Sequence, residues 1–139
     1  MVVGIPLNAL LENDLPAIAA RVRARTRSIY IVNPHNPTGT VSEAVSFKAF
    51  LREMAERTTV IVDEAYLEFE PDFAQKTAVE LTRSGANVVV FRTFGKIYGL
   101  AGLNAIQKTR GGRLSAVKSW KCALGEGTDR DPLLSSHRC

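Results

Sequence analysis

The sequence predicts a layered α/β fold with a mainly parallel sheet, and three observations carry this prediction. Three short runs, residues 28–32, 60–62 and 88–91, have the length and the β-branched or aromatic composition of buried strands. Segments with helical periodicity separate these runs. Each run gives way to polar residues at its carboxyl end. Strands that alternate with helices are typical of a parallel sheet with helices packed against it.

The first half of the chain contains the clearest helix signals. Asp14 can cap a helix that begins at Leu15, where a proline is tolerated in the first turn. Ser42 can cap a second helix, in which apolar residues recur at i, i+3, i+4 and i+7 and so form one apolar stripe. These four residues are Phe47, Phe50, Leu51 and Met54.

Other segments give weaker signals. Residues 2–7 are a candidate strand, although a glycine and a proline within them disfavour it. Residues 74–84 predict a weaker helix that stops near Gly85, and a further helix is expected to begin near Tyr98. After residue 106 no sustained period remains, so we expect residues 107–139 to be poorly ordered.

Composition and charge exclude several classes of protein. The chain has 139 residues, 45% of them hydrophobic and 23% charged, as in ordinary globular domains. No apolar run approaches the roughly 20 residues that span a bilayer, and no signal peptide is visible. We therefore expect a cytoplasmic protein without a membrane partner.

The net charge of +4 belongs to one end of the chain. Residues 1–106 contain 11 basic and 11 acidic residues, whereas residues 107–139 contain 7 and 3. A nucleic-acid partner is therefore not expected, because such a partner needs basic residues clustered on a structured face. Two cysteines, Cys122 and Cys139, lack the paired spacing of a metal site and are interpreted as free thiols.

Polar residues with chemical potential follow the predicted strands. Because ligands of open α/β sheets bind beyond the carboxyl ends of the strands, Asn36, Asp63 and Lys96 should face one crevice. Lys96 is an anion binder, a Schiff-base nucleophile or a merely solvated side chain. Asp63 is either a helix cap or turn former, or the partner of a cationic ring nitrogen.

The neighbours of these residues leave similar alternatives open. Tyr66 is close enough to Asp63 in the chain to share its cavity, or it is a half-buried aromatic with a satisfied hydroxyl group. The Asn36 amide either satisfies the turn backbone or donates to a phenolate oxygen. His35 is a candidate acid or base, although a lone loop histidine is usually not catalytic.

Three ordered motifs together carry a family resemblance. They are Asn33-Pro-His-Asn-Pro-Thr-Gly39, Asp63-Glu-Ala-Tyr66 and Thr93-Phe-Gly-Lys-Ile-Tyr-Gly-Leu-Ala-Gly-Leu103. In this order and spacing they resemble the fold-type I aminotransferases, which use pyridoxal 5′-phosphate. The residues of these motifs are most similar to those of the histidinol-phosphate aminotransferases. The resemblance covers residues 1–106, as the central part of a three-layer α/β/α large domain.

The resemblance implies a cofactor site and a reaction. Lys96 would form a Schiff base with the cofactor and later move a proton, while Asp63 would keep the pyridine nitrogen protonated. Asn36 and Tyr66 would bond the 3′-oxygen of the cofactor, and Thr93 would bond its phosphate. The implied reaction moves an amino group from a small-molecule donor, such as glutamate, to a phosphorylated imidazole carbonyl acceptor in histidine biosynthesis.

The sequence also departs from the family pattern. Gly95 stands where many relatives have a serine, and Asn104 stands where most have an arginine on the phosphate. A lost charge-assisted contact is worth roughly 1.5–3 kcal/mol, so cofactor affinity should suffer.

Family members are much longer than this chain. We therefore expect an internal fragment with little or no activity, whose residues 107–139 come from a shifted reading frame or an unrelated sequence. Two alternatives remain. One is another fold-type I enzyme, such as a decarboxylase of a phosphorylated amino acid. The other is a non-catalytic fragment that associates with a partner chain, because family members are commonly homodimers.

Overall fold

Three parallel strands form the centre of the computed structural model of this chain. The structure describes residues 1–99, 105–110 and 113–118. The strands are β1 (Ser28–Val32), β2 (Thr59–Asp63) and β3 (Val88–Phe91), in the order β1–β2–β3. They end nearly in step, because Asp63 is the register partner of both Val32 and Phe91. The predicted parallel sheet is confirmed.

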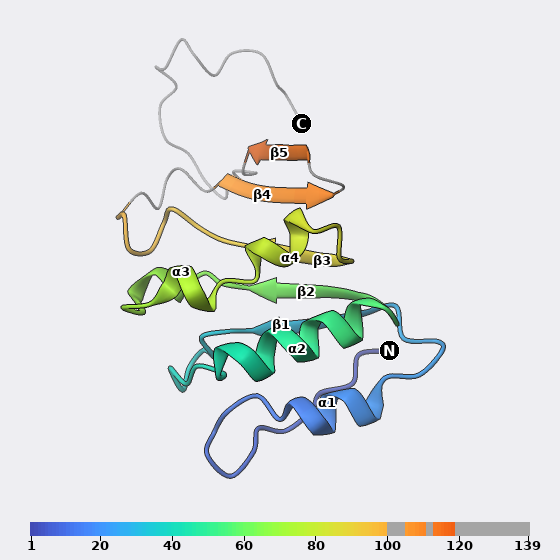
Figure 1. Cartoon of the computed structure of the whole chain (residues 1–139). Coiled ribbons are helices and arrows are strands. Elements are labelled where there is room, and N and C mark those ends of the chain that lie inside the picture. The colour runs from blue at the N-terminus through green and yellow to red at the C-terminus, as the bar shows by residue number, and fades with distance from the viewer. Residues whose placement is uncertain (100–104, 111–112, 119–139) are drawn as a thin grey trace, which may run out of the picture.

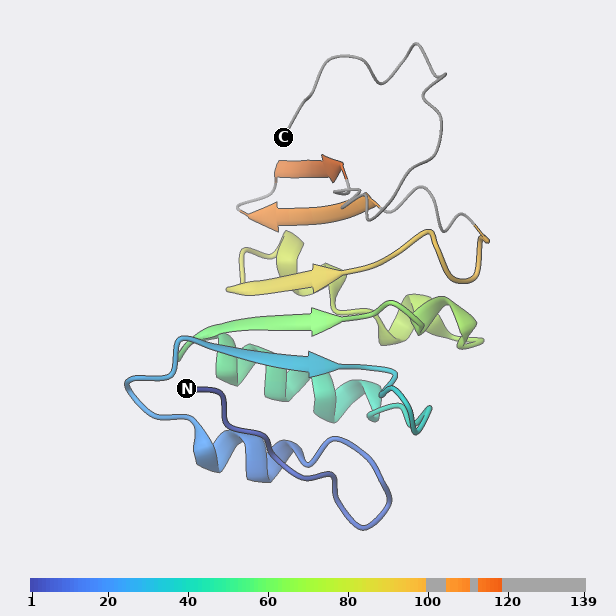
Figure 2. The ribbon, with the colours of Figure 1, turned by 180° about the vertical axis from the view of Figure 1, so that it is seen from behind.

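Helices cover one face of this sheet (Figure 1). The bounds are α1 (Leu15–Arg21), α2 (Ala44–Ala55), η1 (Leu67–Phe69), α3 (Phe73–Lys76) and α4 (Val79–Arg83). On this face α2 packs against β2 and α4 against β3, and α1 packs beside α2, whereas α3 lies beyond the carboxyl end of β2 (Figure 1). Seen from the opposite side, the strands lie in front, α2 lies behind them and α1 lies below β1 (Figure 2). The described residues thus supply the sheet and one helical layer of the predicted three-layer arrangement.

The hydrophobic core lies between the sheet and this helical layer. The strands contribute alternate residues to it, as the two-residue period of a strand requires. These residues are Ile29, Ile31, Val60, Val62, Val88 and Val90. All four residues of the predicted apolar stripe on α2 are buried against them. The other sheet face carries Tyr30, Ile61 and Asp63, none of which is buried.

Two helix starts test the capping predictions. Asp14 caps α1 as predicted, since its Oδ1 accepts a hydrogen bond from the Ala17 N–H at 2.9 Å. The prediction that Ser42 caps α2 is wrong. The cap is Glu43, whose carboxylate accepts from the N–H groups of Val45 and Ser46, both at 2.8 Å. The buried Ser42 instead donates its N–H to Asn33 Oδ1 at 2.9 Å.

The weaker predictions have mixed outcomes. Residues 2–7 form no strand, and no strand of the described residues pairs with them. The predicted helix over 74–84 is split into α3 and α4, which Gly85 follows at φ +85°. Tyr98 lies in a turn, and residues 100–104 of the helix predicted after it lie outside the described residues.

Two further strands lie near the predicted domain boundary. β4 (Ala105–Arg110) and β5 (Arg113–Lys118) form an antiparallel pair, and β4 lies beside β3 (Figure 1). β4 crosses the boundary that we placed between residues 106 and 107. The separate character of residues 107–139 stays a prediction, and residues 119–139 lie outside the described residues, as do Cys122 and Cys139.

Candidate active site at the carboxyl ends of the strands

Asp63 ends β2, and two donors hold its carboxylate. The Tyr30 hydroxyl donates to Oδ2 at 2.5 Å, and the Ala65 backbone N–H donates to Oδ1 at 3.0 Å. Tyr30 lies two residues before Val32, the register partner of Asp63, so both side chains emerge on the same sheet face. The sequence analysis missed Tyr30, because the pattern alone does not give the register between two strands.

The contact with Asp63 changes the acidity of Tyr30. It raises the pKa of Tyr30 to about 12, first through the hydrogen bond and then through burial and the Asp63 charge. All three causes disfavour the phenolate form. Tyr30 is therefore a hydrogen-bond donor to Asp63 at every physiological pH.

Lys96 and Tyr66 come together after β3 and β2. The Lys96 Nζ lies 5.2 Å from the centroid of the Tyr66 ring, within cation–π range. The Tyr66 ring also lies near the ring of Phe69 in η1, with 6.2 Å between the two ring centroids. The structure thus brings an amine and a phenol together at the sheet edge where Asp63 ends its strand.

Thr93 stands two residues after β3. Its Oγ1 accepts a hydrogen bond from the Gly95 N–H at 3.0 Å, which turns the chain toward Lys96. At Gly95, where the resemblance leads one to expect a serine, the chain therefore contributes a backbone donor and no hydroxyl group. Asn104, the second departure, lies outside the described residues.

The proline-rich loop after β1 carries Asn36 in an exposed position. His35 is half-buried, and its Nδ1 lies 2.8 Å from Thr38 Oγ1 within the same loop. Thr38 and Thr40 both donate from their hydroxyl groups to the Leu11 carbonyl oxygen, at 3.2 and 2.7 Å. These contacts give His35 a place in the internal bonding of the loop.

Glu64 is a second residue that the sequence analysis did not single out. Its side chain is only 1% exposed, and it accepts from Thr77 Oγ1 at 2.7 Å and from the Ala78 N–H at 2.6 Å. Burial raises the pKa of Glu64, against the opposing effect of these two hydrogen bonds and of Arg92. An acid directly after Asp63 looks solvent-exposed in sequence, because nothing local shows that residues 77 and 78 cover it.

Arg92 lies between Glu64 and a further acid, Glu68. Its Nη2 is 2.8 Å from Glu68 Oε1, and its Nε is 3.8 Å from Glu64 Oε2. Both pairs are ion pairs by distance, yet neither nitrogen has a hydrogen-bond partner in the described part of the chain. This cluster ties the residues after β2 to the residue that precedes Thr93.

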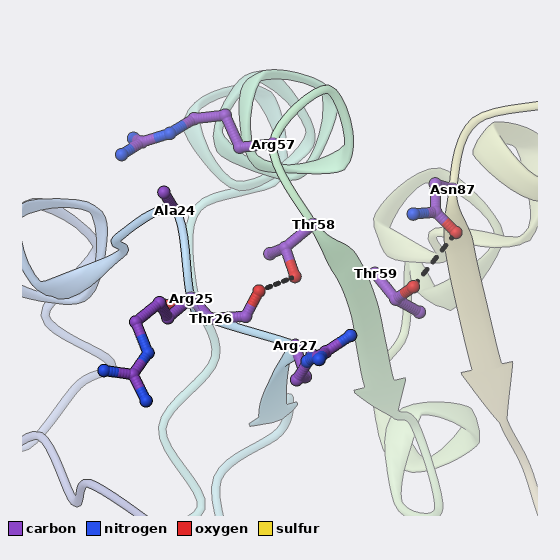
Figure 3. A pocket seen from close by; sticks show the side chains of 8 residues that line it. All are labelled: Ala24, Arg25, Thr26, Arg27, Arg57, Thr58, Thr59 and Asn87. Atoms are coloured by element: carbon purple, nitrogen blue, oxygen red, sulfur yellow. Dashed lines mark hydrogen bonds between the residues drawn. The ribbon is translucent and has the colours of Figure 1, made fainter.

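A cavity of about 590 Å³ lies at the other end of the strands, away from Asp63 and Lys96 (Figure 3). It surrounds the amino ends of the strands, and three arginines, Arg25, Arg27 and Arg57, are among its lining residues. Across it, Thr58 Oγ1 donates to the Thr26 carbonyl oxygen at 3.1 Å. None of the residues predicted for the site lines this cavity.

The described residues give two more findings about sites. No group of three or more histidine, cysteine, aspartate or glutamate residues is placed among them to hold a metal ion. None of the helices within that same part of the chain is long and apolar enough to cross a membrane.

Comparison with known proteins decides the family. The model of the family described as aminotransferase class I and II matches residues 2–110. The chain belongs to this family. The match runs four residues past the boundary that we placed at residue 106.

Two kinds of aminotransferase are found among the curated relatives of this chain. An aromatic amino acid aminotransferase of Cutibacterium acnes is 44% identical over 101 residues, which are 73% of this chain and 29% of that protein. Histidinol-phosphate aminotransferase 1 of Idiomarina loihiensis is 43% identical over 93 residues, 67% of this chain and 25% of that protein. The chain therefore spans less than a third of the length of these curated relatives.

A solved structure agrees with the family assignment. The histidinol-phosphate aminotransferase of Sinorhizobium meliloti, crystallised in complex with pyridoxal-5′-phosphate, is 36% identical to the chain. The TM-score is 0.64, and the match covers 75% of this chain and 28% of that one. The α/β fold predicted from the sequence is thus shared with a cofactor-binding member of the family.

Proposed function

We propose that this chain is the cofactor-binding part of a pyridoxal-phosphate-dependent aminotransferase. The observation that carries the proposal is the contact of Lys96 with Tyr66, 5.2 Å from Nζ to ring centroid, at the carboxyl edge of the sheet where Asp63 ends β2. Membership of the class I and II aminotransferases supports it.

The donor set at this edge fits the chemistry of pyridoxal phosphate. An aldehyde needs an amine, which is Lys96, and a ring nitrogen that carries a proton needs a carboxylate, which is Asp63. The carboxylate accepts a hydrogen bond on each of its two oxygens, which fixes its orientation at the end of β2. Thr93 supplies a hydroxyl group, which suits a phosphate oxygen.

Each residue has a definable task at this site. Bound pyridoxal phosphate supplies an aldehyde that condenses with amines and a ring that accepts an electron pair. Asp63 holds a proton at the ring nitrogen, while the Asn36 amide and the Tyr66 hydroxyl donate to the 3′-oxygen. The Lys96 Nζ would take the proton from the substrate Cα and deliver it to C4′ of the cofactor during amino transfer.

The substrates follow from the motifs and the relatives. The proposed reaction moves an amino group from a small-molecule donor to a carbonyl acceptor. The residues of the three motifs favour the histidinol-phosphate aminotransferases, which act in histidine biosynthesis. The aromatic amino acid branch is the second candidate, because sequence identity does not separate the two branches. The aromatic amino acid aminotransferase is 44% identical to this chain and the histidinol-phosphate aminotransferase is 43% identical. Full-length relatives assayed with both acceptors would separate the two.

The shortness of the chain bears on its own activity. For this stretch of chain on its own, which supplies less than a third of the length of its relatives, we propose weak or absent turnover. Association with a second copy or a longer relative is proposed from the homodimers common in the family, and a cytoplasmic location is proposed from membership of the class I and II aminotransferases.

Reductive trapping tests the cofactor site. The purified chain is incubated with pyridoxal phosphate, reduced with borohydride, digested and mapped by mass spectrometry. We expect the pyridoxyl adduct on Lys96 at low cofactor excess. Lys48 and Lys76 are internal controls, because ion pairs with Glu80 and Glu70 already engage them.

A substituted chain sharpens this test. Lys96→Gln should abolish the low-excess adduct and leave the labelling of the other lysines unchanged. Equal labelling of Lys48, Lys76 and Lys96 in the unmodified chain would refute the proposed site.

A further inference from the structure

We propose that Tyr30 is a positioning residue for Asp63 in the cofactor site. Its hydroxyl donates to Asp63 Oδ2 at 2.5 Å and thereby fixes the orientation of the carboxylate. This inference rests on the proposed function, in which Asp63 holds a proton at the ring nitrogen of the cofactor.

The position of Tyr30 indicates that its hydroxyl group matters more than its ring. The residue is 57% exposed and lies on the sheet face opposite the helical layer, whereas Ile29 and Ile31 beside it are buried in the core. Burial of the ring therefore contributes little at this position. Within the described residues, the side chain makes one specific polar contact, the hydrogen bond to Asp63.

The two donors of Asp63 come from different parts of the backbone. Ala65 lies two residues after Asp63 and donates to Oδ1 from a local turn. Tyr30 lies 33 residues earlier, on the neighbouring strand, and donates to Oδ2. A carboxylate held from both sides does not rotate freely, so it meets a ring nitrogen with less loss of side-chain entropy.

The protonation state of Tyr30 suits this role. A tyrosine hydroxyl with its ordinary pKa of 10.0 already keeps its proton at neutral pH, and the contact with Asp63 raises the pKa of Tyr30 further, to about 12. The hydroxyl therefore has a proton to donate to Asp63 throughout the physiological range.

A double-mutant cycle tests the role in cofactor binding. The cofactor concentration that gives half of the Lys96 adduct is measured for the full chain, for Tyr30→Phe, for Asp63→Asn and for the double variant. We expect Tyr30→Phe to raise this concentration about threefold to tenfold, as the loss of one hydrogen bond would. In the Asp63→Asn background the same substitution should have no further effect.

Tyr98→Phe is the matched control. Tyr98 is 54% exposed, close to the value for Tyr30, and the substitution likewise removes one hydroxyl group. If Tyr30→Phe left the half-saturating concentration as unchanged as Tyr98→Phe does, Tyr30 would not be a positioning residue. An equal effect of Tyr30→Phe in both Asp63 backgrounds would also overturn the inference, because the effect would then bypass Asp63.

A cofactor-free readout separates this inference from the proposed function. The ¹³Cζ resonance of Tyr30 reports the hydrogen bond of the phenol, and Asp63→Asn should shift it at neutral pH while leaving that of Tyr98 in place. An unchanged Tyr30 resonance would refute the pair itself, whatever the cofactor does. If the Tyr30 resonance did shift but no adduct formed on Lys96, the pair would exist and the proposed function would be refuted. The role of Tyr30 in cofactor binding would then be refuted with it.

Discussion

The carboxylate of Glu64, at the end of β2, accepts a hydrogen bond at 2.6 Å from the backbone N–H of Ala78, at the start of α4. Thr77 donates to the other carboxylate oxygen at 2.7 Å. One buried acid therefore fixes the chain between α3 and α4 against the sheet.

The acidity of Glu64 predicts how stability depends on pH. Its pKa is raised in the folded chain, with burial as the largest cause, so the folded state binds more protons than the unfolded state. The resulting stabilisation is fully present below the ordinary pKa of 4.5 and is lost as the pH rises through the raised value. Urea unfolding midpoints measured across this pH range should therefore fall with rising pH.

Glu64→Gln should flatten this dependence, because an amide of the same shape still accepts from the Ala78 N–H, can donate to Thr77 Oγ1 and does not ionise. Glu56→Gln, on an exposed residue, is the control and should leave the slope unchanged. An unaltered slope in Glu64→Gln would show that another group causes the dependence.

The buried side chain of Asn33 is a second stability test. It is 1% exposed, and its Oδ1 accepts from the buried Ser42 N–H at 2.9 Å. Asn33→Ala leaves this donor without its acceptor, and we expect a loss of about 1–3 kcal/mol in the free energy of unfolding. Denaturant titration measures it against the exposed Gln75→Ala, whose effect should stay within about 0.5 kcal/mol. Equal losses in both variants would contradict the expectation.

Gly39 is a third test, because its φ is +74° and no atom within 4 Å would meet an added Cβ. Any cost of Gly39→Ala is therefore a backbone cost, which we expect to be about 1–2 kcal/mol. Gly4→Ala is the matched control, since it also has open space around it but no positive φ. Thermal or urea unfolding compares the two, and a Gly39→Ala chain as stable as Gly4→Ala would rule out the strained conformation.

The cap of α2 gives a prediction with the opposite pH sign. Hydrogen bonds from the backbone N–H groups of Ser46 and Val45 lower the pKa of Glu43. Its stabilisation is thus present above the ordinary value of 4.5 and is lost as the pH falls through the lowered one. Glu43→Ala should lower the unfolding midpoint at pH 7 and should matter less in acid. Glu53→Ala, on an exposed residue of the same helix, should do neither.

The sequence predicted the elements whose signal is local. The three strands were predictable because short apolar runs bounded by polar residues leave few other folds, and α2 because its four buried residues repeat with the helical period. The cap prediction for Ser42 was wrong because α2 begins one residue later, where the longer side chain of Glu43 reaches the N–H groups of Val45 and Ser46. The break between α3 and α4 was also invisible, because it depends on Glu64.

In the candidate site, too, the features with a local signal were predictable and those that depend on strand register were not. The placement of Asp63 and Lys96 at one edge followed from the alternation of strands and helices, and the proximity of Tyr66 to Lys96 agrees with it. The contact of Tyr30 with Asp63 depends on the register of β1 against β2, which no local pattern contains. The functional roles of Asn36, Asp63, Tyr66, Thr93 and Lys96 stay predictions.

The matched ends of the strands limit which length changes the gene can accept. Insertion of one codon within β2 would turn Asp63 from the open face of the sheet to the helical side, because successive side chains alternate between faces. Two inserted codons would restore the face but carry the carboxylate about 7 Å along the strand, away from Tyr30. Length polymorphism among natural variants should therefore gather in the surface connections, such as residues 8–13, and be absent from residues 59–63.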